Sequence, residues 1–166
     1  SINYEKKINK NFLYDVCFVG GWANNGFNEK KKIMIDVFSK FKKSGMRCGF
    51  FVNKNISHET ETEILSSSKV CLNIHDAYQR SLGLDTNERT FKSLGLNGLL
   101  VSDKIKQLDN MFPEVYTSLD ADKIVNKVME YIEAPDANIL EQKEKNRKNI
   151  FLKHCYINRV ETMIDL

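Results

Sequence analysis

The chain has 166 residues, of which 42% are hydrophobic and 28% charged. These values predict one ordinary globular domain with a sizeable core and argue against wholesale disorder. The net charge of +3 suits an anionic small molecule or a lipid surface. It is too small to indicate nucleic-acid binding, and the lysines are scattered over several predicted faces rather than clustered.

The four cysteines, Cys17, Cys48, Cys71 and Cys155, include no C-x-x-C pair. Cys17 and Cys71 fall in apolar runs, where a free thiol behaves as a small buried hydrophobe. The pattern argues against a disulfide framework or a zinc site and favours a reducing, intracellular compartment. The sequence has no apolar run near 18 residues in length and no signal-peptide pattern.

The first half of the chain alternates strand-like and helix-like segments. Apolar runs predict strands, and apolar residues at helical spacing predict helices. The strands are expected at 13–21, 48–52, 70–74 and 98–101, and the helices at 28–43, 58–67 and 86–96. Gly45 is expected to end the first helix as its left-handed C-terminal residue.

The pattern changes after residue 101. A helical turn is expected at 105–110 and an edge strand at 115–116, followed by a helix that Pro135 ends and by helices at 139–153 and 156–166. The predicted fold class is α/β, with a Rossmann-like parallel sheet, helices on both faces and a helical C-terminal tail. The tail is expected to pack across one edge of the sheet or against a domain outside this sequence.

In open parallel sheets, ligands bind at the carboxyl ends of the strands. The loops there are expected to form a rim that comprises Gly20–Trp22, Asn53–Asn55, His75–Tyr78 and Ser102–Asp103. The glycine pair would let main-chain amides approach a phosphate, although a tight turn explains it equally well. His75 could contact a ligand or simply order its loop. Trp22 could stack on a ligand or anchor its loop.

The strongest candidate is Arg89. It follows Asn87 at an expected helix start, where unpaired N–H groups and the helix dipole attract anions. The planar guanidinium adds a fork that matches phosphate oxygens. We therefore expect Asn87, Arg89 and the adjacent Thr90 to contact a phosphate.

Two segments resemble a known family. Ser68 to His75 reads S-K-V-C-L-N-I-H, and Asn87 to Asp103 reads N-E-R-T-F-K-S-L-G-L-N-G-L-L-V-S-D. Together they resemble the donor-binding half of GT-B glycosyltransferases of the CgeB-like, group 1 type. The flanking Y-D-V-C-F-V-G and H-C-Y-I-N-R-V segments resemble the first strand and closing helices of that half.

The resemblance implies transfer of a sugar, of hexosyltransferase type, from a nucleoside-diphosphate sugar to a glycan, lipid or protein acceptor in glycan biosynthesis. It implies no metal, no other cofactor and no nucleic acid. Residues 1–12 would then be a linker from an absent N-terminal acceptor domain, and residues 13–166 the donor domain. This isolated half would be inactive, because the acceptor-binding half is missing. A trimmed form of a complete protein stays an alternative. The implied location is cytoplasmic, with a peripheral position on the inner face of the membrane open to the full-length protein.

The donor-binding residues implied are Gly20, Gly21, His75, Asn87, Arg89, Thr90, Lys92 and Asp103, with no catalytic residue assigned. Lys92 departs from the family, which has a glutamate there that is thought to hold the donor's ribose hydroxyls. Either Glu88 or Asp103 substitutes as the acceptor, or donor binding is altered or lost. The alternatives are a non-catalytic nucleotide- or sugar-binding scaffold derived from a transferase, and a flavodoxin-like or receiver-like module. The latter would need an acidic cluster after the first strand, where this chain reads G-G-W-A-N-N.

Overall fold

A computed structural model of the chain describes residues 5–22 and 30–164. Its sheet is entirely parallel, with the strand order β2-β1-β3-β4-β5. The strands are β1 (Val16–Gly20), β2 (Cys48–Val52), β3 (Val70–Asn73), β4 (Leu100–Ser102) and β5 (Tyr116–Thr117). The predicted α/β Rossmann-like class is confirmed. The strand order is also that of flavodoxin-like folds, so topology alone does not separate these two readings.

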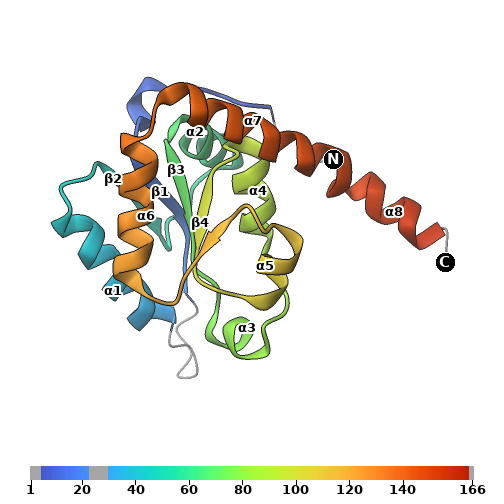
Figure 1. Cartoon of the computed structure of the whole chain (residues 1–166), viewed down its shortest axis with the longest axis horizontal. Helices are drawn as coiled ribbons and strands as arrows, with labels where there is room; N and C mark the ends of the chain where they lie inside the picture. The colour runs from blue at the N-terminus through green and yellow to red at the C-terminus, as the bar shows by residue number, and fades with distance from the viewer. Residues whose placement is uncertain (1–4, 23–29, 165–166) are drawn as a thin grey trace.

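Helices cover both faces of the sheet (Figure 1). One face carries α1 (Lys30–Lys43) and α6 (Ala121–Glu133); the other carries α2 (His58–Ser67), α4 (Glu88–Leu96), α5 (Lys106–Met111) and α7 (Asp136–Lys153). A short 3-10 turn (Lys10–Phe12), α3 (Ala77–Leu82) and α8 (Tyr156–Ile164) complete the described elements. Side chains alternate along β1, so Phe18 packs toward α1 and α6, whereas Cys17 and Val19 pack toward α2 and α4.

Most element ends follow local signals. The buried stripe of α1 includes Met34, Val37 and Phe41, which recur at helical spacing. Gly45 follows α1 with φ +78°, as expected for a left-handed C-terminal residue. Helix α6 ends at Glu133, just before Pro135, as predicted.

Helix α3 was not predicted. Its six residues are too few to show helical periodicity, but its ends carry signals. Gln79 Oε1 accepts a hydrogen bond from the Asp76 N–H at 3.0 Å, in the manner of a capping box. Gly83 ends the helix with φ +68°. The D-A-Y-Q sequence and this glycine could therefore have located α3.

The C-terminal tail packs on a face of the sheet rather than across an edge. Helix α7 lies over α4, where Arg147 Nε donates to the Gly95 carbonyl at 2.9 Å and Asn146 Nδ2 donates to the Gly98 carbonyl at 2.8 Å. Helix α8 continues past this contact and projects from the body (Figure 1). Its apolar residues are exposed, with Ile157 at 63% and Met163 at 74%.

The segment before β1 lies against α2 and α7. Lys6 Nζ is 2.7 Å from Glu144 Oε1, Lys7 Nζ is 2.9 Å from Glu59 Oε1, and the Asn9 N–H donates to Ser67 Oγ at 2.8 Å. These contacts do not test whether another domain precedes it, so the boundary at residue 12 stays a prediction. None of the helices in the described residues has the length and apolarity needed to cross a bilayer.

Lys143 on α7 is a largely buried cation. Its Nζ donates to the Ser68 carbonyl at 3.3 Å. Burial lowers its pKa from an ordinary value of 10.5 to about 8, a shift that the nearby thiols of Cys71 and Cys17 oppose and that Lys6 reinforces. Below pH 8 the folded chain therefore keeps a poorly solvated charge that the unfolded chain keeps in water.

We expect Lys143→Met to stabilise the fold at pH 7 by up to about 3 kcal/mol. The wild-type free energy of unfolding should rise between pH 8 and 10, because the folded state releases this proton before the unfolded state does. The variant should lack that rise. Its loss of the lysine donor does not leave the Ser68 carbonyl unpaired, because Asn97 Nδ2 also donates to that carbonyl. Urea unfolding at several pH values measures this, with the exposed Lys145→Met as the control. Identical pH profiles for the two variants would contradict the assignment.

Candidate functional site

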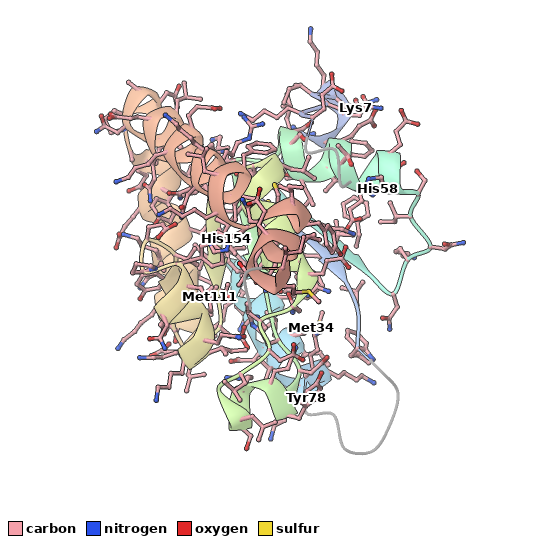
Figure 2. The ribbon with its side chains drawn as sticks, turned by 90° about the vertical axis from the view of Figure 1, so that its right-hand side faces the viewer. Lys7, Met34, His58, Tyr78, Met111 and His154 are labelled. Atoms are coloured by element: carbon pink, nitrogen blue, oxygen red, sulfur yellow. The ribbon has the colours of Figure 1, made fainter. Side chains whose placement is uncertain are left out.

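The chain leaves β1 and β3 toward opposite faces of the sheet. β1 leads to α1 on one face, whereas β3 leads through α3 to α4 on the other. This divergence between neighbouring strands is the topological switch point, where ligands of open α/β sheets bind. Figure 2 shows Tyr78 of α3 at this end of the molecule and Lys7 at the opposite end.

Arg89 extends from the first turn of α4 to the switch point. Its Nε donates to the Val19 carbonyl at 2.6 Å, and its Nη1 donates to Asn73 Oδ1 at 2.9 Å. The guanidinium lies 4.9 Å from the ring centre of Phe18. Burial lowers the pKa of Arg89, although nearby carboxylates, with Glu61 first, oppose that shift. The side chain is therefore fixed in position.

Gly20 lies directly against Arg89. A Cβ at position 20 would overlap the guanidinium, so this close approach requires glycine. Nη2 is the atom nearest to that point, and within residues 5–22 and 30–164 it has no hydrogen-bond acceptor. Arg89 thus keeps one donor group available beside the end of β1.

Lys30 provides a second cation here. Its side chain is 4% exposed, and its Nζ lies 3.1 Å from Asp76 Oδ1. Burial lowers its pKa first, and the positive charge of Arg89 lowers it further, while Asp76 and Asp103 oppose the shift. An anion between Lys30 and Arg89 would offset both the desolvation and the repulsion.

Sequence reasoning missed Lys30, which stands in a run of three lysines. A signal was present, because Lys30 shares the helical phase of Met34, Val37 and Phe41, the buried stripe of α1. A lysine on a buried stripe near a glycine pair could have been selected from its neighbours on that ground.

The second glycine of the pair, Gly21, lies directly against Asn53. A Cβ on Gly21 would overlap Asn53 Oδ1, which accepts from the Trp22 N–H at 3.1 Å. Asn53 follows β2 and has φ +51°. The Trp22 amide is therefore already bonded. Trp22 itself is half-buried, and Lys31 Nζ lies 5.9 Å from its ring centre.

His75 and Asp103 form a buried pair behind this point. Nδ1 of His75 lies 2.7 Å from Asp103 Oδ1, and its Nε2 lies 3.0 Å from Thr86 Oγ1. Because a carboxylate only accepts, Nδ1 carries a proton, and Nε2 shares a hydrogen bond with the Thr86 hydroxyl. Both ring nitrogens are engaged and the side chain is 0% exposed. This arrangement supports the loop-ordering interpretation of His75.

Asn87, Thr90 and Asp103 belong to the same network. Asn73 Nδ2 donates to Asn87 Oδ1 and to Thr90 Oγ1, both at 3.0 Å. Asp103 accepts from the His75 N–H at 3.0 Å and lies 3.4 Å from Arg80 Nε. Asn87 and Thr90 thus belong to the hydrogen-bond network of Asn73, which holds Arg89 in position. Direct contact of these predicted residues with a ligand stays a prediction. Asp103 is 2% exposed and already accepts from His75 and Ser102, and its part in holding a ribose stays a prediction.

Lys92 points to α2 rather than to the switch point. Its Nζ lies 3.1 Å from Glu61 Oε2 and 3.3 Å from Glu88 Oε1, and its side chain is 18% exposed. Its pKa is affected most by burial, which lowers it, but the hydrogen bond and charge of Glu61 and the charge of Glu88 raise it overall. Lys92 therefore links α4 to α2.

We expect Lys92→Glu to place three carboxylates together and to destabilise the fold by about 1 kcal/mol. Adding Glu61→Lys should restore most of that loss, because the pair is then reversed. Thermal unfolding measures both variants. Calorimetry with nucleoside diphosphates tests the site: an altered affinity would mean that residue 92 reaches the ligand, whereas unchanged affinity would mean that it acts only between the helices.

The described residues include no group of three or more His, Cys, Asp or Glu side chains placed to hold a metal ion. The four cysteines are free, and the sulfurs of Cys17 and Cys71 lie 3.7 Å apart within the core.

Comparison with known proteins decides the family. A model described as glycosyl transferase-like matches residues 22–165, which is most of the chain. The chain belongs to the glycosyl transferase-like family. This confirms the resemblance seen in the sequence, and no curated protein matched the chain.

Two solved structures of low sequence identity are similar to this chain, and the first of them shares its fold. The N-terminal domain of trehalose-6-phosphate phosphatase from Candida albicans has a TM-score of 0.62 and 10% identity, over 90% of this chain and 32% of that one. AviGT4, a glycosyltransferase involved in avilamycin A biosynthesis, has a TM-score of 0.44 and 12% identity, over 83% of this chain and 52% of that one. This glycosyl transferase-like chain thus spans about a third and about half of the two matched chains.

Proposed function

We propose that this glycosyl transferase-like domain is the donor-binding half of a two-domain GT-B glycosyltransferase that uses a nucleoside-diphosphate sugar. One observation carries the proposal: the half-buried guanidinium of Arg89 lies against Gly20 at the switch point, with Nη2 free to donate, and the buried cation Lys30 is close enough for the charge of Arg89 to lower its pKa. A diphosphate is the donor group that such a pair would neutralise.

In the proposed reaction, the bond between the sugar's anomeric carbon and the diphosphate breaks, and a bond to the oxygen of an acceptor hydroxyl forms. The hydroxyl proton passes to the leaving diphosphate or to water. Lys30, Arg89 and the first amides of α4 would stabilise the negative charge that the leaving diphosphate gains. The proposal assigns no metal and no further cofactor. The acceptor, a glycan, lipid or protein, would bind mainly to a separate domain, so the isolated half should bind donor weakly and transfer little. We further propose that the transferred sugar is a hexose and that the reaction belongs to glycan biosynthesis. The full-length protein would act in the cytoplasm, at the inner face of the membrane.

Ligand-dependent thermal stability tests this proposal. A nucleoside diphosphate at about 100 times its Kd should stabilise the fold by about 2.7 kcal/mol, which is about 5–10 °C for a domain of this size. UDP, GDP, ADP and their sugars are screened beside the bare nucleosides, which should shift the unfolding temperature far less. A screen in which every diphosphate behaves like its nucleoside would contradict a diphosphate site.

A non-catalytic nucleotide- or sugar-binding scaffold is the second candidate. Lys92 favours it, because this lysine replaces the family glutamate and is committed to Glu61 and Glu88. Nucleotide binding without sugar transfer or donor hydrolysis, measured on the full-length protein, would favour the scaffold over the enzyme.

A further inference from the structure

Two helices on opposite faces of the sheet, α1 and α2, carry opposite charge. Helix α1 contains six lysines and one acidic residue, Asp36. Helix α2, on the other face, contains three glutamates and no lysine or arginine. Lysines were expected to be scattered over several faces, but α1 alone carries six of them.

Most of these lysines lie on the exposed side of α1. Beside the exposed Asp36, the side chains of Lys31, Lys32, Lys42 and Lys43 all project there, with Ile35 between them and 56% exposed. We call these five residues the α1 basic face. None of its lysines forms an ion pair within residues 5–22 and 30–164, whereas Lys40, on the flank, is 2.7 Å from Asp122. The face lies on the opposite side of the molecule from α8 (Figure 1).

The apolar groups on this surface identify its partner. Ile35 is exposed among the lysines, and half-buried Trp22, next to Lys31, extends the apolar character toward the switch point. Lysines that surround an exposed aliphatic and an indole match a bilayer, in which headgroups are anionic and the interface accepts such side chains. α1 bears no arginine, the residue most suited to nucleic-acid phosphates and bases.

We propose that the α1 basic face docks on an anionic lipid bilayer. Because α1 begins at the switch point, docking along it would hold the carboxyl end of the sheet close to the membrane surface, where a membrane-bound acceptor could reach a bound donor. This inference rests on the membrane location proposed above. It does not rest on the identity of the donor, so vesicle binding and nucleotide binding can fail independently.

Vesicle flotation tests the docking surface. The chain should bind phosphatidylcholine vesicles that contain about one third phosphatidylglycerol, and pure phosphatidylcholine far less. The triple variant Lys32→Gln, Lys42→Gln, Lys43→Gln should bind about 100-fold more weakly, since each lysine near an anionic surface contributes about fivefold. Trp22 is the sole tryptophan, and its emission should shift to the blue on the anionic vesicles.

The matched control is Lys145→Gln, Lys148→Gln, Lys153→Gln, which removes three exposed charges from α7. It should keep most of the wild-type binding. The proposal is overturned if wild type ignores anionic vesicles, if both triple variants lose binding equally, or if a single-stranded oligonucleotide binds the α1 basic face more tightly than the vesicles do. If vesicles bind but no nucleotide does, the docking surface stands and the donor site fails.

Discussion

Arg89→Ala is expected to weaken nucleoside-diphosphate binding by about 10- to 150-fold, because a charge-assisted hydrogen bond contributes about 1.5–3 kcal/mol. Binding of the bare nucleoside should barely change, and added salt should narrow the difference between variant and wild type. The reason is geometric: Nε and Nη1 are fixed on Val19 and Asn73, which leaves Nη2 beside Gly20 for a ligand. Calorimetry at two salt concentrations measures this.

The same substitution also leaves the Val19 carbonyl and Asn73 Oδ1 without a donor, so binding must be measured on protein shown to be folded. Arg147→Ala is the matched control. Arg147 also donates through Nε to a main-chain carbonyl, that of Gly95, but on α7, away from the switch point. It should lose stability without losing affinity. Equal losses for nucleoside and diphosphate in Arg89→Ala would make Arg89 a structural residue and the site assignment wrong.

Asp103→Asn is expected to destabilise the fold by about 3–5 kcal/mol, because it removes the buried carboxylate that pairs with Arg80 and leaves donors of His75 without an acceptor. Asp103 accepts from the His75 N–H at 3.0 Å and pairs with His75 Nδ1 at 2.7 Å, and Arg80 Nε lies 3.4 Å away. An amide at this position would turn an N–H group toward some of these donors. The unfolding temperature should fall by about 10–15 °C.

Asp109→Asn provides the comparison. Asp109 is half-buried and accepts from Thr117 Oγ1 at 2.5 Å, and the exposed Lys104 Nζ lies 3.8 Å away; among the described residues it contacts no buried histidine or arginine as Asp103 does. It should cost about 1 kcal/mol. If Asp103→Asn is no more damaging than Asp109→Asn, the His75–Asp103 pair does not support the strand ends and the network has been misread.

The sequence predicted the sheet because its signals are local. Apolar runs such as Cys48–Val52 and the left-handed Gly45 act through their own backbone and neighbours, and both were placed correctly. The capped, six-residue α3 was missed because its periodicity is too short. The position of α7 over α4 depends on contacts between residues far apart in sequence, such as Arg147 with Gly95.

The candidate site was predicted less completely, for a related reason. Arg89 and Gly20 could each be selected from a motif, but only the fold brings the guanidinium against the glycine. The ion pair between Lys92 and Glu61 joins α4 to α2, and these two helices touch only in the folded chain. His75 and Asp103 were expected on the rim at the carboxyl ends of the strands. In the fold both side chains are buried beneath that rim, within the hydrogen-bond network.

The central claim is that a diphosphate binds between Gly20, Lys30 and Arg89. Amide and guanidinium NMR shifts during titration with a nucleoside diphosphate test it most directly. The account predicts that the largest changes fall on Gly20, Gly21, the start of α1 and the first turn of α4, including Arg89 Nε. Saturable changes confined to other surfaces, such as α7, or no changes at millimolar ligand, would contradict it.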